Sequence, residues 1–317
     1  MKTDGEAKAK FFESMRFRFN KCLFPTINCP NDAIRAHSVQ KATSLSLIEE
    51  TGHVCEIKMK IDGDQPVCKF ARVGRNEAST FTGLCNEHDT QLFRPIDTKP
   101  LKLGDPEQMF LVAYRSATRE LHAAMLGAIR VQTTLQNLVK LGRVEASEAS
   151  PAMMAATQAL LKSWLVWRYR FQHYDRTLAK GDYSSIMHST FSIAGHRPVL
   201  ASSSYFPIDD VSLSKKTVWI ALNVIPVGEE DTEVIFSYPK ALSGPARRRI
   251  ASVMTKTGED QLSSLSTLVL DSTENFFMRP SHIEGWPDEK RQRIEEAFFS
   301  TVTKGAVLQP SPELMLF

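Results

Sequence analysis

The chain has 317 residues, 42% of them hydrophobic and 24% charged, with a formal net charge of +3. This composition is typical of a globular protein long enough for two domains. Its apolar runs are shorter than the ~20 residues that a membrane span needs, and its N-terminus lacks the apolar core of a signal peptide. We therefore expect a cytoplasmic protein with no membrane partner.

The predicted elements begin with a helix over Gly5–Asn20 that is followed by a cluster of positive charge. Arg16, Arg18 and Lys21 fall near its C-terminal end. Cations at this end of a helix suit the helix dipole. The alternative is that they contact phosphate groups, so these three residues are candidate nucleic-acid contacts.

All five cysteines lie between Cys22 and Cys85. In the cytosol, clustered cysteines indicate metal ligands or buried thiols and not a disulfide framework. A proline-rich loop carries Cys22 and Cys29, and a C-x2-H motif at Cys85 and His88 follows downstream. Two residues between a thiolate and an imidazole suit one turn of chain around a tetrahedral ion. We predict a structural Zn²⁺ site closed by these four residues, within a zinc-binding domain over residues 1–100.

Two strands, His53–Ile61 and Val67–Val73, are predicted between the halves of this site. Asp62, Gly63 and Asp64 would join them as a hairpin. Cys55 and Cys68 lie on these strands. Either could replace one of the four ligands, although a thiol on a strand is more often buried in the core.

A helical hairpin is predicted over residues 101–183 and a mixed domain over residues 184–317. Polar turns separate two long amphipathic helices, at about Pro106–Leu141 and Pro151–Lys180, which we expect to pack antiparallel. In the mixed domain, β-branched and aromatic runs predict strands at Arg197–Phe206, Thr217–Pro226, Thr232–Tyr238 and Leu265–Leu270, and helices at Pro239–Lys256 and Pro287–Thr303. The fold class is therefore α+β.

Arg247, Arg248 and Arg249 form the densest basic run of the mixed domain. Arginine forks suit phosphate oxygens, so these residues are candidate nucleic-acid contacts. The alternative is a solvated helix face. The sequence contains no Walker A, Rossmann, G-x-S-x-G or H-E-x-x-H motif, which removes the commonest nucleotide-binding, hydrolase and metalloprotease interpretations.

The first hundred residues resemble a treble clef, in particular the HNH-type (ββα-metal) nuclease domains that carry an extra structural zinc. The residues that carry the resemblance are Cys22 and Cys29, the AHS motif at Ala36–Ser38, and GLCNEHD at Gly83–Asp89. The resemblance implies that His37 is the general base and that Asp89 binds a catalytic Mg²⁺ or Mn²⁺. It implies for His88 one of two roles, the last zinc ligand or the second ligand of the catalytic ion. The family's central asparagine has no clear counterpart.

His37 and Asp89 also have structural interpretations. His37 could hydrogen-bond a zinc thiolate, and Asp89 could be a first-turn carboxylate of the following helix. Two functions therefore stay open. One is metal-dependent hydrolysis of phosphodiesters in DNA or RNA, and the other is a non-catalytic, zinc-structured module that binds nucleic acid or protein.

The whole chain is similar to uncharacterised bacterial proteins that share three motifs. These are AHS, F-x-G-x-C-x2-HD and an EN-aromatic motif, which stands here at Glu274–Phe276. By analogy we expect a role in bacterial genome defence, with a protein partner in a multi-component system.

Overall fold

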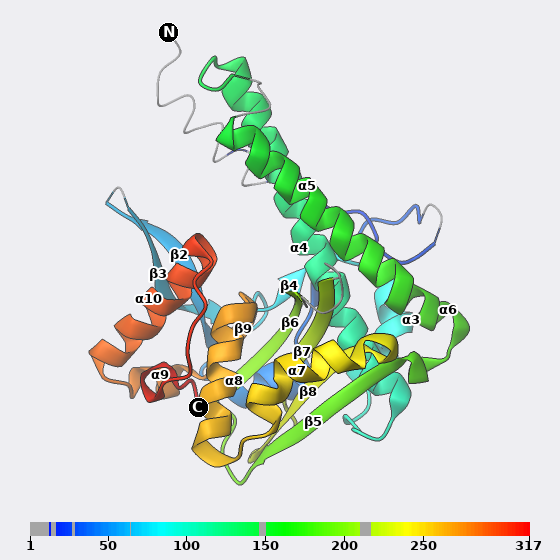
Figure 1. Cartoon of the computed structure of the whole chain (residues 1–317). Coiled ribbons are helices and arrows are strands. Elements are labelled where there is room, and N and C mark those ends of the chain that lie inside the picture. Colours follow the sequence, from blue (N-terminus) through cyan, green and yellow to red (C-terminus); the bar gives the residue numbers. More distant parts are fainter. Residues whose placement is uncertain (1–12, 14–16, 27–28, 64, 146–149, 210–216) are drawn as a thin grey trace. The chain divides into compact units, whose positions relative to one another are not determined.

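The computed structural model describes residue 13 and residues 17–26, 29–63, 65–145, 150–209 and 217–317 (Figure 1). Most of the helix predicted over Gly5–Asn20 lies outside the described residues, and its described end, residues 17–20, is not helical. Helices and antiparallel strands are both abundant, so the predicted α+β class is confirmed.

The chain divides into two compact units, each assembled from separate segments. The helical unit comprises Met1–Ala36, Phe81–Gln91 and Ala117–Lys180, and the sheet unit comprises His37–Thr80, Leu92–Ser116 and Gly181–Phe317. From the sequence we expected three contiguous domains, and that division stays a prediction. A short two-stranded sheet, β1 (Ala36–His37) with β4 (Thr80–Phe81), stands where the chain passes from one unit to the other.

A seven-stranded antiparallel sheet forms the centre of the sheet unit (Figure 1). Its spatial order is β3-β2-β9-β6-β7-β8-β5. The strands are β2 (His53–Asp62), β3 (Gln65–Gly74), β5 (Ile186–Ala194), β6 (Leu200–Asp209), β7 (Thr217–Pro226), β8 (Asp231–Pro239) and β9 (Phe276–Met278). The four predicted strands in β2, β3, β7 and β8 and most of β6 are confirmed, whereas β5 and β9 were not predicted.

The β2–β3 hairpin has the predicted turn. Asp62 pairs with Gln65, and Gly63 has a φ of +59°, a backbone conformation that glycine adopts without steric cost. Cys55 of β2 pairs with Met278 of β9, so the hairpin forms one edge of the seven-stranded sheet and contributes residues to its core.

Side chains alternate between the two faces of β7, and this alternation separates two layers of helix. Leu222 and Val224 belong to the main core, which includes residues of α7 (Ser243–Met254), α8 (Gly258–Ser272) and α10 (Asp288–Lys304). Asn223 points to the opposite face, where its side-chain oxygen accepts a hydrogen bond from Ser116 of α4 (Pro106–Lys140). The sheet therefore lies between α7, α8 and α10 on one face and the first turns of α4 on the other. Short segments complete the unit: α2 (Ser46–Ile48) and α9 (Pro280–Glu284).

The strand predicted at Leu265–Leu270 is wrong, because these residues lie in α8. All eight residues from Ser263 to Leu270 are buried. A helix buried on every side has no charged face, so periodicity alone cannot distinguish it from a buried strand. The predicted helices at Pro239–Lys256 and Pro287–Thr303 are confirmed as α7 and α10.

The predicted helical hairpin is confirmed in the helical unit. α4 is followed by α5 (Pro151–Tyr169), which continues through a π-helical turn (Arg170–Asp175) into α6 (Arg176–Lys180). Figure 1 shows α4 and α5 side by side, and the side chain of Gln132 donates a hydrogen bond to the carbonyl of Ala156 at 3.0 Å. Among the described helices, none combines the length and apolar character that crossing a membrane requires.

Candidate metal centre

The four predicted zinc ligands converge in the helical unit. Cys22 and Cys29 come from the loop, Cys85 lies just before α3 (Asn86–Asp97), and His88 lies in its first turn. Within the described part of the chain, these are the residues whose donor atoms gather as a group of at least three metal-ligating side chains, all within 4.8 Å of one another. The pairing of two distant half-sites is therefore as predicted.

The spacing of the donor atoms fits a tetrahedral zinc ion. His88 Nδ1 lies 3.4 Å from Cys22 Sγ, 3.6 Å from Cys29 Sγ and 3.3 Å from Cys85 Sγ, and the sulfurs of Cys29 and Cys85 are 3.8 Å apart. Zinc bonds of ~2.3 Å to sulfur and ~2.05 Å to nitrogen at tetrahedral angles require edges of ~3.8 Å and ~3.5 Å. The group could hold a metal ion such as zinc.

Backbone contacts hold the two halves of the group together. The backbone N–H of Cys85 donates to the sulfur of Cys22 at 3.3 Å, and the N–H of Leu23 donates to the carbonyl of Gly83 at 2.8 Å. The ring of Phe24 stacks on His88, with centroids 4.0 Å apart and an interplanar angle of 5°. These contacts fix the orientation of the ligands, as the surroundings of a zinc site commonly do.

The thiols of the group differ in acidity when no metal is present. Burial raises the pKa of Cys22 to about 11. Burial also opposes ionisation of Cys85, but a hydrogen bond from the backbone of His88 and the neighbouring thiols lower the pKa of Cys85 overall. Because zinc binds thiolates, metal binding must release protons from this group, and acid must favour its dissociation.

Cys55 and Cys68 are not part of the metal group. Both lie in the core of the sheet unit, with 5% and 4% of their surface exposed, and burial raises the pKa of Cys55 to about 11. Of the two alternatives that the sequence left open for these cysteines, the buried thiol is therefore the one that the structure shows.

His37 and Asp89 lie in different units. The Nδ1 atom of His37, in β1, donates a hydrogen bond to the carbonyl of Ala78 at 2.9 Å and lies 3.3 Å from Ser79 Oγ. Asp89 is an acidic residue in the first turn of α3, and its backbone N–H donates to the carbonyl of Cys85 at 2.9 Å. Asp89 therefore lies where a first-turn carboxylate can stabilise the N-terminus of the helix, as its structural interpretation proposed. Their roles as base and metal ligand stay a prediction.

The predicted nucleic-acid contacts are exposed where the structure describes them. Arg18 and Lys21 precede the metal loop, and Arg247, Arg248 and Arg249 lie on α7. Arg16 lies outside the described residues. The first set belongs to the helical unit and the second to the sheet unit.

A buried polar network on the α4 side of the sheet was not predicted. Ser116 Oγ lies 2.9 Å from Ser203 Oγ and donates to Asn223 Oδ1 at 2.9 Å. Asn275, of the EN-aromatic motif, donates to Ser38 Oγ of the AHS motif at 3.0 Å and to the carbonyl of Ser203 at 2.7 Å. The signal for this network was the presence of serines and an asparagine inside otherwise apolar strands.

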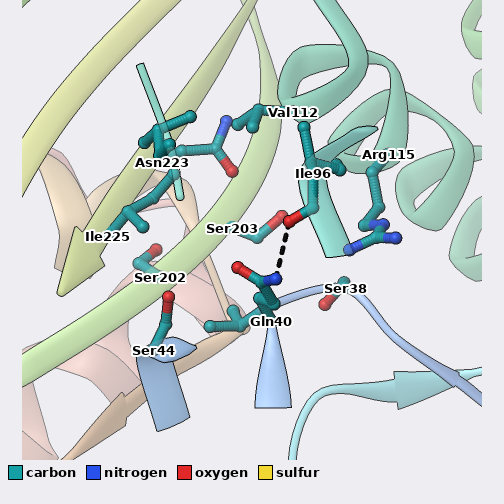
Figure 2. A pocket seen from close by; sticks show the side chains of 12 residues that line it. Ser38, Gln40, Ser44, Ile96, Val112, Arg115, Ser202, Ser203, Asn223 and Ile225 are labelled. Atoms are coloured by element: carbon teal, nitrogen blue, oxygen red, sulfur yellow. Dashed lines mark hydrogen bonds between the residues drawn. The ribbon is translucent and has the colours of Figure 1, made fainter. Parts of the chain in front are cut away.

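Figure 2 shows the cavity beside this network. Ser38, Ser203 and Asn223 line it, and Gln40 donates across it to the carbonyl of Ile96 at 2.6 Å. Its volume is about 30 Å³, which accommodates one or two water-sized molecules.

Arg115 also lines the cavity, and its positive charge is balanced by a carboxylate. It makes a two-pronged ion pair with Asp97, at 2.9 and 2.7 Å, and its guanidinium lies 4.0 Å from the centre of the Phe93 ring. Two motifs that the sequence singled out therefore meet in a structural network and not in a substrate-sized site.

No family model matches the chain, and neither a curated protein nor a solved structure matches it. The resemblance to HNH-type domains therefore stays a prediction from the sequence motifs.

Proposed function

We propose that the chain is a zinc-structured nucleic-acid-binding protein and that the helical unit provides the binding surface. The observation that carries the proposal is a segregation of charge. The helical unit contains 16 Lys and Arg against 10 Asp and Glu, a formal charge of +6, whereas the sheet unit contains 23 against 26, a charge of −3. A unit with this net positive charge attracts polyanions, because binding releases the counterions of the phosphates.

The metal group supports a structural role for the ion. A zinc ion held by three thiolates and one imidazole has all four positions filled by the protein, whereas catalytic zinc keeps a position for water or substrate. Zinc together with its three thiolates has a net charge of about −1, so the loaded site leaves the helical unit positive. We propose that the ion stabilises a treble-clef-like fold, in which isolated bridges join Lys21 to Asp32 and Ala33 to Cys85 around the ligand loop.

Binding is tested by fluorescence anisotropy of the zinc-loaded protein with labelled DNA and RNA of about 20 nucleotides. We expect the association constant to fall steeply with salt, with a slope of log K against log salt concentration of about −0.7 per phosphate contacted on a single strand. Binding that is independent of salt, or no binding at low salt, would refute the proposal. Elemental analysis of the same sample should give one zinc per chain.

Metal-dependent hydrolysis is a second candidate, because the carbonyl of Ala78 fixes the tautomer of His37. A carbonyl only accepts, so His37 Nδ1 carries the proton of the neutral ring, and Nε2 is the nitrogen with proton affinity. Asp89 would hold Mg²⁺ or Mn²⁺ in this candidate. Cleavage by the wild type that His37→Ala abolishes, with zinc retained, would support hydrolysis. Binding without cleavage under either metal would leave the non-catalytic function.

A further inference from the structure

One face of α5 and the adjoining π-helical turn exposes large apolar side chains. Trp164 and Trp167 are 46% and 47% exposed, Leu160 is 50% exposed, and Phe171 is 41% exposed. Their spacing of four, three and four residues places them along one side of the helix. The inward side of α5 is occupied by other residues, among them Ala156 and Val166, which are buried. The exposed aromatic rings are therefore not part of the packing between α4 and α5.

Arginine side chains accompany these rings. The guanidinium of Arg168 lies 5.1 Å from the centre of the Trp164 ring, and that of Arg176 lies 5.3 Å from the Phe171 ring. Trp167 and Phe171 are stacked, with centroids 5.5 Å apart and an interplanar angle of 10°. The face thus combines flat π surfaces with positive charge.

Acidic residues are absent from this stretch of the sequence. No Asp or Glu occurs between residues 149 and 174, which include all of α5. A second copy of the chain docked here would place arginines against arginines, so the charge disfavours self-association through this face. A polyanion with flat, stackable groups complements both the positive charge and the aromatic rings of this face.

We propose that this aromatic face, made of Trp164, Trp167 and Phe171 with Arg168 and Arg176, binds single-stranded nucleic acid by stacking with its bases. In a duplex the bases are already stacked on one another, so only a single strand offers their planes to protein rings. Phe171 lies seven positions after Trp164, which corresponds to a length of ~10 Å along the helix. That length corresponds to about three nucleotides at the stacked repeat of ~3.4 Å.

This inference deepens the proposed function and rests on it. The positive charge of the helical unit would attract any nucleic acid, and the aromatic face would add a preference for strands without a complement. Charge and stacking therefore make separate contributions, and they can be measured separately.

The experiment compares a labelled single strand of about 20 nucleotides with a duplex of the same length and phosphate spacing, using the zinc-loaded full-length protein. We expect Trp164→Ala and Trp167→Ala each to weaken single-strand binding about 10-fold, while duplex affinity changes less than about twofold. Trp167→Phe should retain most of the affinity, since it keeps a ring on the helix. Ile61→Ala, at a 69% exposed apolar position of the β2–β3 hairpin, is the matched control and should bind as the wild type does.

Intrinsic tryptophan fluorescence gives a second readout. A single strand that stacks on exposed indoles should quench their emission, and the quenching should fall in each alanine variant. Trp219, which is 3% exposed, should not contribute to it.

Each alternative outcome has a distinct meaning. Equal loss of single-strand and duplex binding, or no loss in either tryptophan variant, overturns the stacking inference but leaves the proposed function standing. No nucleic-acid binding by the wild type overturns both. A dimer in sedimentation that both alanine variants dissociate would identify the face as a self-association surface and overturn the inference.

Discussion

Gly83→Ala should destabilise the protein, although glycine-to-alanine changes at compatible positions usually stabilise. A Cβ atom at Gly83 would lie 2.2 Å from Cε2 and 2.9 Å from Cδ2 of the Phe81 ring. Phe81 is only 7% exposed and packs edge-on against His122 at 5.9 Å, so its ring has little room to move. The entropic gain of alanine is ~0.4–1 kcal/mol, whereas overpacking costs ~1–3 kcal/mol. We expect a net loss of about 1–2 kcal/mol in the free energy of unfolding.

The same substitution should loosen the metal loop, because the carbonyl of Gly83 accepts the hydrogen bond from Leu23, next to the ligand Cys22. The assay is urea unfolding followed by fluorescence, together with the rate at which a chelator removes zinc. Gly127→Ala in α4, where a Cβ meets nothing within 4 Å, is the control and should stabilise by ~0.5–1 kcal/mol. Adding Phe81→Leu to Gly83→Ala should recover part of the loss. A stabilised Gly83→Ala variant with unchanged zinc release would refute this reasoning.

Three further predictions concern the ligands, the polar network and pH. Cys85→Ser should abolish tight zinc binding and unfold the metal loop, as shown by elemental analysis and by proteolysis of residues 17–36, whereas Cys55→Ser should keep one zinc per chain. Asn275→Ala should cost ~1–3 kcal/mol in urea unfolding, since it leaves buried groups of Ser38 and Ser203 without their donor. Burial lowers the pKa of His188 to about 4, so the folded protein keeps this ring neutral while the unfolded chain protonates it below ~6.5. Stability should therefore fall as pH decreases from 7.5 to 5, and His188→Gln should remove about 2 kcal/mol of that loss; a pH slope unchanged in the variant would contradict the assignment.

The metal ligands could be predicted because cysteine and histidine spacing constrains ion geometry directly. The strands β7 and β8 could be predicted because β-branched and aromatic runs stand between turn residues, and the helices α4 and α5 because polar turns bound two long stretches. α8 could not, since complete burial removes the polar face that distinguishes a helix from a strand. β9 was missed because it has only three residues, too few for any alternation to show.

The division of the chain into units was also beyond the sequence. The hairpin of β2 and β3 lies between the two halves of the metal site along the chain, which suggested that it belongs to the zinc domain. Its place in the seven-stranded sheet depends on pairing between Cys55 and Met278, residues more than two hundred positions apart. The exposure of Trp164 and Trp167 was likewise hidden, because apolar residues at helical spacing more often face a core.

The most direct test of the proposed function is a pair of charge reversals on exposed helical arginines, one in each unit. Arg168→Glu changes the aromatic face of α5 in the helical unit, and Arg249→Glu changes α7 in the sheet unit. Both variants should keep one zinc per chain. We predict that Arg168→Glu weakens binding of a single strand about 10-fold or more, whereas Arg249→Glu changes it less than about twofold. Equal losses in the two variants, or the larger loss in Arg249→Glu, would contradict the assignment of the binding surface to the helical unit.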